Sequence, residues 1–183
     1  MLMRAFLFAC CLVLGACATT SATQTLPSID QVEYRIGAGD KLALAVFREE
    51  ALSGEFQVNE AGMISLPLVG DIQASGKTVP QFRTDLTAFL AREFVRDPNV
   101  TVSVVDYRPV YVLGEVENPG EFEYSENMSV FALVAKAGGF TYRADQTVVM
   151  VRHENEADER AYVLTSGGAV QPGDTVRFVA RYF

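Results

Sequence analysis

Short runs of strand-forming residues, separated by tight-turn residues, are the feature that most limits what this chain can fold into. Residues 100–104 alternate strictly between apolar and polar side chains, as a half-buried strand does. Further strand candidates are residues 41–47, 110–116, 148–151 and 176–179, and segments rich in Gly, Pro and Asp lie between them. Together with two short helical segments, this pattern predicts an α+β protein.

The first helix is predicted from its start signal. Thr78 and Gln81 have the spacing of a capping box, and Pro80 lies in the first turn, where its missing N–H is harmless. Asp97-Pro98 marks the end, since a residue before proline avoids the helical region. The apolar residues at helical spacing are expected to face the core; they are Phe82, Leu86, Phe89, Leu90 and Phe94.

A second helix is predicted over residues 130–137, with Ser129 as its cap and Gly138-Gly139 as its stop. Two turns are predicted from their residue types. Residues 56–58 and 63–66 are expected to form a hairpin in which Gly62 has a positive φ. Asn118-Pro119-Gly120 fits the centre of a type II turn.

One short pattern occurs twice. Gly39-Asp40 precedes the alternating residues 41–44, and Gly173-Asp174 precedes the similar residues 175–178. Each copy predicts a tight turn that leads into a strand. We expect the two turns to lie near each other, which would connect the start of the folded chain to its end.

The N-terminus has the layout of a bacterial lipoprotein signal. Arg4 precedes an apolar run that is short for a membrane span, and Leu14-Gly15-Ala16-Cys17 ends it with a cleavage site. We therefore expect residues 1–16 to be removed and Cys17 to carry acyl chains. Residues 17–32 are mostly small and polar, so they are expected to form a flexible tether, with folded structure beginning near Glu33.

Composition and charge argue against several classes of function. The chain has a formal charge of −8, which disfavours binding to nucleic acid. Cys10 and Cys11 lie in the signal and Cys17 is the lipid site, so no thiolate metal site is expected. The single histidine, His153, lies in a charged run and is interpreted as an exposed loop residue. The sequence therefore predicts no enzyme activity, no metal and no cofactor.

Two groups of motifs then carry a family resemblance. Residues 34–42, 62–70 and 97–102 resemble the polysaccharide export lipoproteins of the bacterial outer membrane. Residues 112–120 and 135–140 resemble the β-grasp domain called SLBB, for soluble-ligand-binding β-grasp. We accordingly expect a small export domain of strands plus one amphipathic helix over residues 33–106, and a β-grasp-like SLBB domain with a C-terminal strand over residues 107–183.

The motif positions are interpreted as turn and fold positions rather than as sugar contacts. They are Gly37, Gly39, Asp40, Pro67, Gly70, Gly76, Asp97, Pro98, Gly114, Pro119, Gly120, Gly138, Gly139, Gly173 and Asp174.

The resemblance implies a role in secretion of capsular or extracellular polysaccharide. It implies a protein that is lipid-anchored in the outer membrane on its periplasmic face and forms a homo-oligomeric ring through which the polymer passes. The expected partners are an inner-membrane polysaccharide co-polymerase and the translocated polysaccharide.

The chain departs from the larger family members because no C-terminal amphipathic helix is predicted. Two alternatives stay open: the chain forms only a periplasmic ring, or a separate outer-membrane pore protein completes the path. Two other functions are also considered. They are a periplasmic lipoprotein that binds a saccharide or another small ligand, and a scaffold in some other envelope complex.

Overall fold

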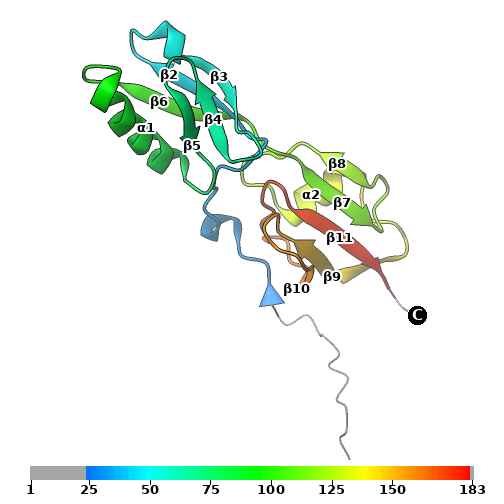
Figure 1. The fold of residues 1–183 in the computed structure, drawn as a ribbon. Helices are drawn as coiled ribbons and strands as arrows, with labels where there is room; N and C mark the ends of the chain where they lie inside the picture. The colour runs from blue at the N-terminus through cyan, green and yellow to red at the C-terminus, as the bar shows by residue number, and fades with distance from the viewer. Residues whose placement is uncertain (1–23, 182–183) are drawn as a thin grey trace, which may run out of the picture.

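The computed structural model describes residues 24–181, in two domains that lie end to end (Figure 1). The predicted signal, Cys17 and the first part of the predicted tether lie outside the described residues. Each domain has its own hydrophobic core. The predicted α+β class and the order of the two domains are confirmed.

The first domain combines a three-stranded antiparallel sheet, a hairpin and a helix. The sheet has the order β3-β2-β6, with β2 at Lys41–Val46, β3 at Gly54–Gln57 and β6 at Val100–Asp106. The hairpin pairs β4 (Met63–Leu66) with β5 (Gly70–Gln73). Helix α1 (Val79–Glu93) packs its apolar face into the same core. The side chains of Leu42, Phe82 and Leu86 are fully buried there.

Helix α1 begins as predicted, because the Thr78 hydroxyl accepts a hydrogen bond from the Gln81 N–H and the Gln81 side chain bonds back to the Thr78 N–H. The prediction that Phe89 and Phe94 face the core is wrong. Phe89 and Phe94 are 38% and 40% exposed and stack on each other instead. The buried stripe follows i, i+4, i+8 spacing from Phe82; Phe89 lies at its margin and Phe94 is the residue that caps the helix end.

The second domain is a six-stranded mixed sheet with the order β1-β10-β9-β11-β7-β8, and it packs with helix α2 around one core. Its elements are β1 (Gln24–Thr25), β7 (Val110–Gly114), β8 (Gly120–Phe122), α2 (Val130–Lys136), β9 (Ala144–Arg152), β10 (Arg160–Val163) and β11 (Thr175–Ala180). The last strand, β11, lies parallel to β7 and between β7 and β9 (Figure 1). A hairpin, then a helix, then a final strand parallel to the first is the predicted β-grasp-like arrangement.

The chain enters the fold earlier than predicted. Strand β1 (Gln24–Thr25) pairs in parallel with β10, and Leu26 is only 4% exposed in the core of the second domain. The Ala169 N–H donates to the Pro27 carbonyl. The prediction of a flexible segment up to residue 32 is therefore wrong for residues 24–32. One apolar side chain and backbone pairing with an edge strand order a segment whose composition is mostly polar.

The predicted hairpin of residues 56–58 with residues 63–66 is also wrong. Strand β3 pairs with β2, while β4 pairs with β5 across the turn at residues 67–69. Residues 59–62 still form a tight turn, and Gly62 has the predicted positive φ of 78°. The Gly62 carbonyl accepts hydrogen bonds from the N–H groups of Ala74 and Ser75, which ties this turn to the end of β5.

The predicted type II turn at Asn118-Pro119-Gly120 is absent. Gly120 is already the first residue of β8, with a φ of 156° rather than about 80°. The second helix agrees better: Ser129 caps it, and Gly138 and Gly139 follow it with φ values of 86° and 102°. A long helix that could cross a membrane does not occur within residues 24–181.

Gly114 and Gly139 provide a matched test of how closely the backbone packs. Both have a positive φ, but a Cβ at Gly114 would lie 2.0 Å from the Phe178 carbonyl oxygen, whereas a Cβ at Gly139 would meet open space. We expect Gly139→Ala to cost about 1–2 kcal/mol from backbone strain alone. Gly114→Ala should cost roughly 3 kcal/mol or more, because it must also separate β7 from β11.

Chemical denaturation of both variants measures the difference. Equal free energies of unfolding for Gly114→Ala and Gly139→Ala would contradict the close approach of β7 and β11.

Candidate functional site

The two Gly-Asp turns have the same internal hydrogen bonds. Asp40 and Asp174 are both buried, at 0% and 1% exposure. Each carboxylate accepts a hydrogen bond from the backbone N–H three residues earlier, that of Gly37 at 2.7 Å and that of Gln171 at 2.8 Å. A buried carboxylate that closes its own turn in this way fixes the direction in which the next strand leaves.

Each turn also holds a neighbouring segment of backbone in the same manner. The Gly39 N–H donates to the Val58 carbonyl, and the Val58 N–H donates to the Asp40 carbonyl. In the second copy, the Gly173 N–H donates to the Pro109 carbonyl, and the Tyr111 N–H donates to the Asp174 carbonyl. The similarity seen in the sequence is therefore a similarity of structure.

Arg108 lies between the two turns and contacts both. A Cβ at Gly37 would lie 2.4 Å from the Arg108 guanidinium, and a Cβ at Gly173 would lie 2.9 Å from Arg108 Nε. The absence of a side chain at these two glycines makes room for the arginine. The expectation that the two turns lie near each other is confirmed, with one side chain filling the space between them.

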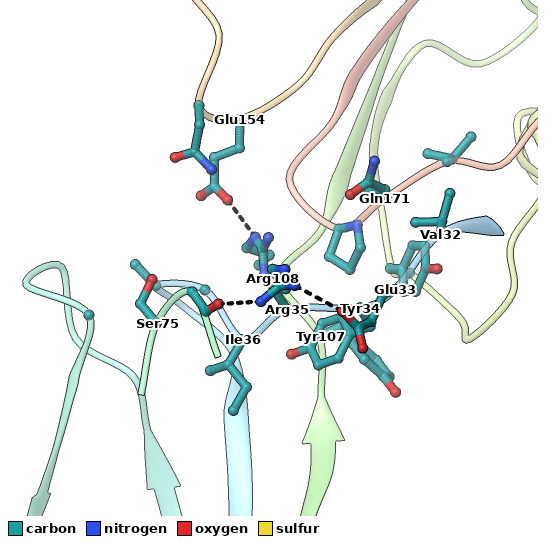
Figure 2. Close-up of a pocket in the computed structure, with 18 of the residues that line it drawn as sticks. Val32, Glu33, Tyr34, Arg35, Ile36, Ser75, Tyr107, Arg108, Glu154 and Gln171 are labelled. Carbon is teal, nitrogen blue, oxygen red and sulfur yellow. Dashed lines mark hydrogen bonds and ion pairs between the residues drawn. The ribbon is translucent and has the colours of Figure 1, made fainter. Parts of the chain in front are cut away.

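Arg108 joins the two domains through charged contacts. Its Nη1 donates to Asp40 Oδ2 at 2.8 Å, and its backbone N–H donates to Asp40 Oδ1 at 2.8 Å. On the other side, Arg108 Nε lies 2.7 Å from Glu154 Oε2, in the loop between β9 and β10 (Figure 2). This last contact is an ion pair without an aligned hydrogen bond, since the buried Nε–H has no acceptor. The guanidinium is thus held by a carboxylate from each domain.

Asp40 receives a further hydrogen bond from the Tyr34 hydroxyl. With Gly37 and Arg108, this gives the buried carboxylate four donors, which compensates for its removal from water. Burial raises the pKa of the Tyr34 hydroxyl, and its hydrogen bond to Asp40 raises it further. Tyr34 therefore stays protonated and continues to donate.

His153 is not the exposed loop residue that the sequence predicted. Its side chain is 23% exposed, and its Nδ1 lies 2.8 Å from Asp174 Oδ1. The hydrogen bond to Asp174 raises the pKa of His153 above its ordinary value of 6.5, against the opposing effect of burial. The loop after β9 thus folds back onto the second Gly-Asp turn, through His153, and onto Arg108, through Glu154.

A cleft of about 640 Å³ opens beside Arg108, between the two domains. Tyr34, Tyr107 and Tyr124 border it and form one aromatic cluster, with ring centroids 5.1 and 5.3 Å apart in edge-to-face contacts. Tyr107 lies beside Tyr34 and below Arg108 in Figure 2. No group of three or more His, Cys, Asp or Glu within residues 24–181 is arranged to hold a metal ion.

The structure gathers only part of the predicted motif set at this site. Gly37, Gly39, Asp40, Gly173 and Asp174 form the two turns, and Gly76 borders the cleft. Elsewhere, Pro67 and Gly70 flank the β4–β5 turn, and Asp97 and Pro98 follow α1. Gly114, Pro119, Gly120, Gly138 and Gly139 lie at the ends of β7, β8 and α2.

Arg108, which contacts both Gly-Asp turns and Glu154, was not predicted from the sequence, and neither were the tyrosines at positions 34, 107 and 124. One signal was available for Arg108. It is a basic residue placed directly before Pro109, where one predicted domain ends and the next begins.

Replacing Arg108 tests its role as the connection between domains. Arg108→Ala leaves the Asp40 carboxylate buried without its cation, so we expect a loss of about 3–5 kcal/mol in the free energy of unfolding. Arg143→Ala is the matched control, because the Arg143 side chain is 56% exposed and its ion pair with Glu115 is long, at 3.9 Å. That variant should change stability by less than about 1 kcal/mol. Similar losses in both variants, measured by urea denaturation, would refute the assignment.

The His153–Asp174 pair predicts a specific pH dependence. Because the folded-state pKa of His153 is raised above 6.5, its stabilising effect is complete below that pH and is lost as the pH rises through the folded-state pKa. We expect the free energy of unfolding to fall from about pH 6 to about pH 9 more steeply in the wild type than in His153→Gln.

The raised pKa can also be measured directly. His153 is the single histidine in the sequence, so its ring resonance in an NMR titration needs no assignment. A titration midpoint below 6.5 would contradict the pairing.

Comparison with known proteins agrees with the two-domain division. Residues 29–105 match the family described as polysaccharide biosynthesis/export protein, and residues 109–174 match the SLBB domain. The two matches meet at residues 106–108, where Arg108 lies.

Three relatives show how far the likeness extends. The chain is 36% identical over 162 residues to the exopolysaccharide production protein ExoF of Rhizobium meliloti, which covers 81% of this chain and 36% of that protein. It is 32% identical over 132 residues to the EPS I polysaccharide export outer membrane protein EpsA of Ralstonia solanacearum, covering 58% of this chain and 35% of that protein.

The polysialic acid transport protein KpsD of Escherichia coli is 29% identical over 109 residues, covering 58% of this chain and 20% of that protein. This chain therefore spans little more than a third of these relatives at most. With two domain matches in the same order as the two domains of the structure, the chain belongs to the polysaccharide biosynthesis/export protein family and carries an SLBB domain.

Proposed function

We propose that this protein is a non-enzymatic component of a machine that exports capsular or extracellular polysaccharide. The observation that carries the proposal is the order of the two domains, an export domain followed directly by an SLBB domain, across residues 29–174. The names of the relatives support it, since they are named for exopolysaccharide production, EPS I polysaccharide export and polysialic acid transport.

The side-chain chemistry around the cleft fits a passive role. Asp40, Asp174, His153 and Arg108 are the most buried charged groups near the cleft, and each is bound to a specific partner. These pairs stabilise turns and join the domains. General acid–base catalysis uses a group whose proton is free to transfer to a substrate, and these groups are committed to structural contacts.

We place the protein at the outer membrane, with Cys17 as a lipid anchor and the folded domains in the periplasm. The Leu-Gly-Ala-Cys sequence at residues 14–17 supports the anchor. One relative is named an outer membrane protein. Gln24 lies in the edge strand of the second domain's sheet, seven positions after Cys17 in the sequence.

We further propose that the protein assembles into a homo-oligomeric ring, which a co-polymerase of the inner membrane contacts and through which the polymer passes. Edge strands β3 and β6 of the first sheet and β8 of the second are available for contacts between subunits. A separate outer-membrane pore protein is a further partner that would complete the path of the polymer.

A second candidate function is a periplasmic lipoprotein that binds a saccharide or another small ligand. The interdomain cleft favours it, because ligand sites occur preferentially between domains. An envelope scaffold without a polymer is the third candidate.

A deletion strain tests the export role. We expect loss of surface polymer in the deletion strain and recovery when the wild-type chain is supplied. The Cys17→Ser variant should fail to restore export because it cannot be lipidated. Cys10→Ser is the matched control, since that cysteine lies in the predicted signal, and it should restore export fully.

Normal surface polymer in the deletion strain would refute the export role. Full recovery with Cys17→Ser would refute the lipid anchor and leave the export role standing. A cross-linking experiment on membranes that yields only monomers would refute the ring.

A further inference from the structure

The cleft between the two domains has the composition of a carbohydrate site. Its volume of about 640 Å³ lies within the range of about 300–1,000 Å³ that is usual for ligand pockets. A sugar ring presents a face of C–H groups and an edge of hydroxyl groups, so it needs aromatic and polar partners side by side. Both kinds of group border this cleft.

The aromatic partners are the three tyrosines. Tyr34 comes from the segment before the first Gly-Asp turn, Tyr107 from the connection between the domains, and Tyr124 from the loop after β8. Their edge-to-face contacts hold the rings in fixed positions. All three side chains are half-buried, which leaves part of each ring open to the cleft.

The polar partners come from both domains. Glu60 lies on the first domain, and Glu126, Asn127 and Gln171 lie on the second. The side chains of these four residues make no hydrogen bond to any other described residue, so their donors and acceptors are available to a ligand. In Figure 2, Gln171 lies on the far side of the cleft from Ser75 of the first domain.

The charge of the lining selects among ligands. Four glutamates, Glu33, Glu60, Glu126 and Glu154, border the cleft with only two arginines. Arg35 is paired with Glu33, and Arg108 is paired with Glu154 and Asp40. Both cations of the lining are therefore paired and the glutamates outnumber them, which disfavours phosphates and acidic sugars.

The connection between the domains adds preorganisation. Arg108 contacts the first Gly-Asp turn through Asp40 and the β9–β10 loop through Glu154, so these two segments are already joined without a ligand. A fixed site loses less entropy on binding than one that must close.

We propose that the interdomain cleft binds a short neutral segment of a polysaccharide, with Tyr107 as a stacking platform and Glu126 and Gln171 as hydroxyl partners. The assignment of the ligand as part of an exported polymer rests on the proposed function. The site itself, and its preference for neutral sugars, rests on the cleft alone.

Calorimetric titration of the full chain, purified in a detergent that has no sugar head group, tests the proposal. The probes are neutral oligosaccharides of glucose, galactose and mannose, uronic acid oligosaccharides, and fragments of whichever polymer the deletion strain lacks. We expect at least one neutral probe to bind, and the acidic oligosaccharides to bind about tenfold more weakly or not at all.

Variants locate the binding site. Tyr107→Ala should weaken binding of the neutral probe by about tenfold, the effect of losing one stacked ring. Gln171→Ala should weaken binding of the neutral probe severalfold. Because this variant leaves the tyrosine cluster intact, it tests the site even if Tyr107→Ala misfolds. Tyr142→Ala is the matched control, because Tyr142 is 82% exposed and does not border the cleft, and it should leave binding unchanged.

Three outcomes would overturn the proposal: no binding of any neutral probe or polymer fragment, equal binding by the Tyr107→Ala, Gln171→Ala and Tyr142→Ala variants, or tighter binding of the acidic oligosaccharides. The results with the defined oligosaccharides do not depend on the export test. A deletion strain with normal surface polymer refutes the export role and leaves the sugar site standing, whereas absent binding with lost export refutes only the sugar site.

Discussion

The buried ion pair between Arg108 and Asp40 is the contact on which the relation of the two domains depends. Asp40 is fully buried and belongs to the turn that starts the first domain's central strand. Arg108 belongs to the three-residue connection between β6 and β7. A buried carboxylate needs a cation and several donors to remain charged, and the arginine supplies both the cation and a backbone N–H. The same contact therefore stabilises a turn, a connection and the interface.

The second Gly-Asp turn extends this arrangement into the SLBB domain. Asp174 closes its own turn and binds His153. Glu154, which follows His153 in the sequence, pairs with Arg108. Charges from the first turn, the connection and the β9–β10 loop thus form one continuous chain of contacts. Two domains linked in this way are expected to present the interdomain cleft in a constant shape, which suits a component that guides a polymer by shape.

Local structure could be predicted from the sequence where the determining residues are close together. The Thr78–Gln81 capping box, the Ser129 cap and the Gly138-Gly139 stop each act within a few residues, and the structure has all three. Strand pairing between β3 and β4 was predicted wrongly, because the choice between β2 and β4 as the partner of β3 depends on the whole sheet. Leu26 shows the same limit, since its burial depends on a strand more than 130 residues later.

The candidate site was predicted in its turns but not in its contacts. Glycine and aspartate at positions 39, 40, 173 and 174 have a recognisable local pattern. Arg108 and the three tyrosines carry no such pattern, because their role comes from segments that meet only in the folded chain. The acidic character of the protein was evident from its composition. In the folded chain, four glutamates border the cleft together with the aromatic cluster.

A double-mutant cycle between Asp40→Asn and Arg108→Gln tests the central claim most directly. Asp40→Asn keeps the size of the side chain and removes its charge, and Arg108→Gln removes the charge with a shorter polar side chain. If the ion pair joins the domains, the free energies of unfolding of the two single variants and the double variant should give a coupling energy of about 1 kcal/mol or more. Additive effects, with a coupling energy near zero, would contradict the account.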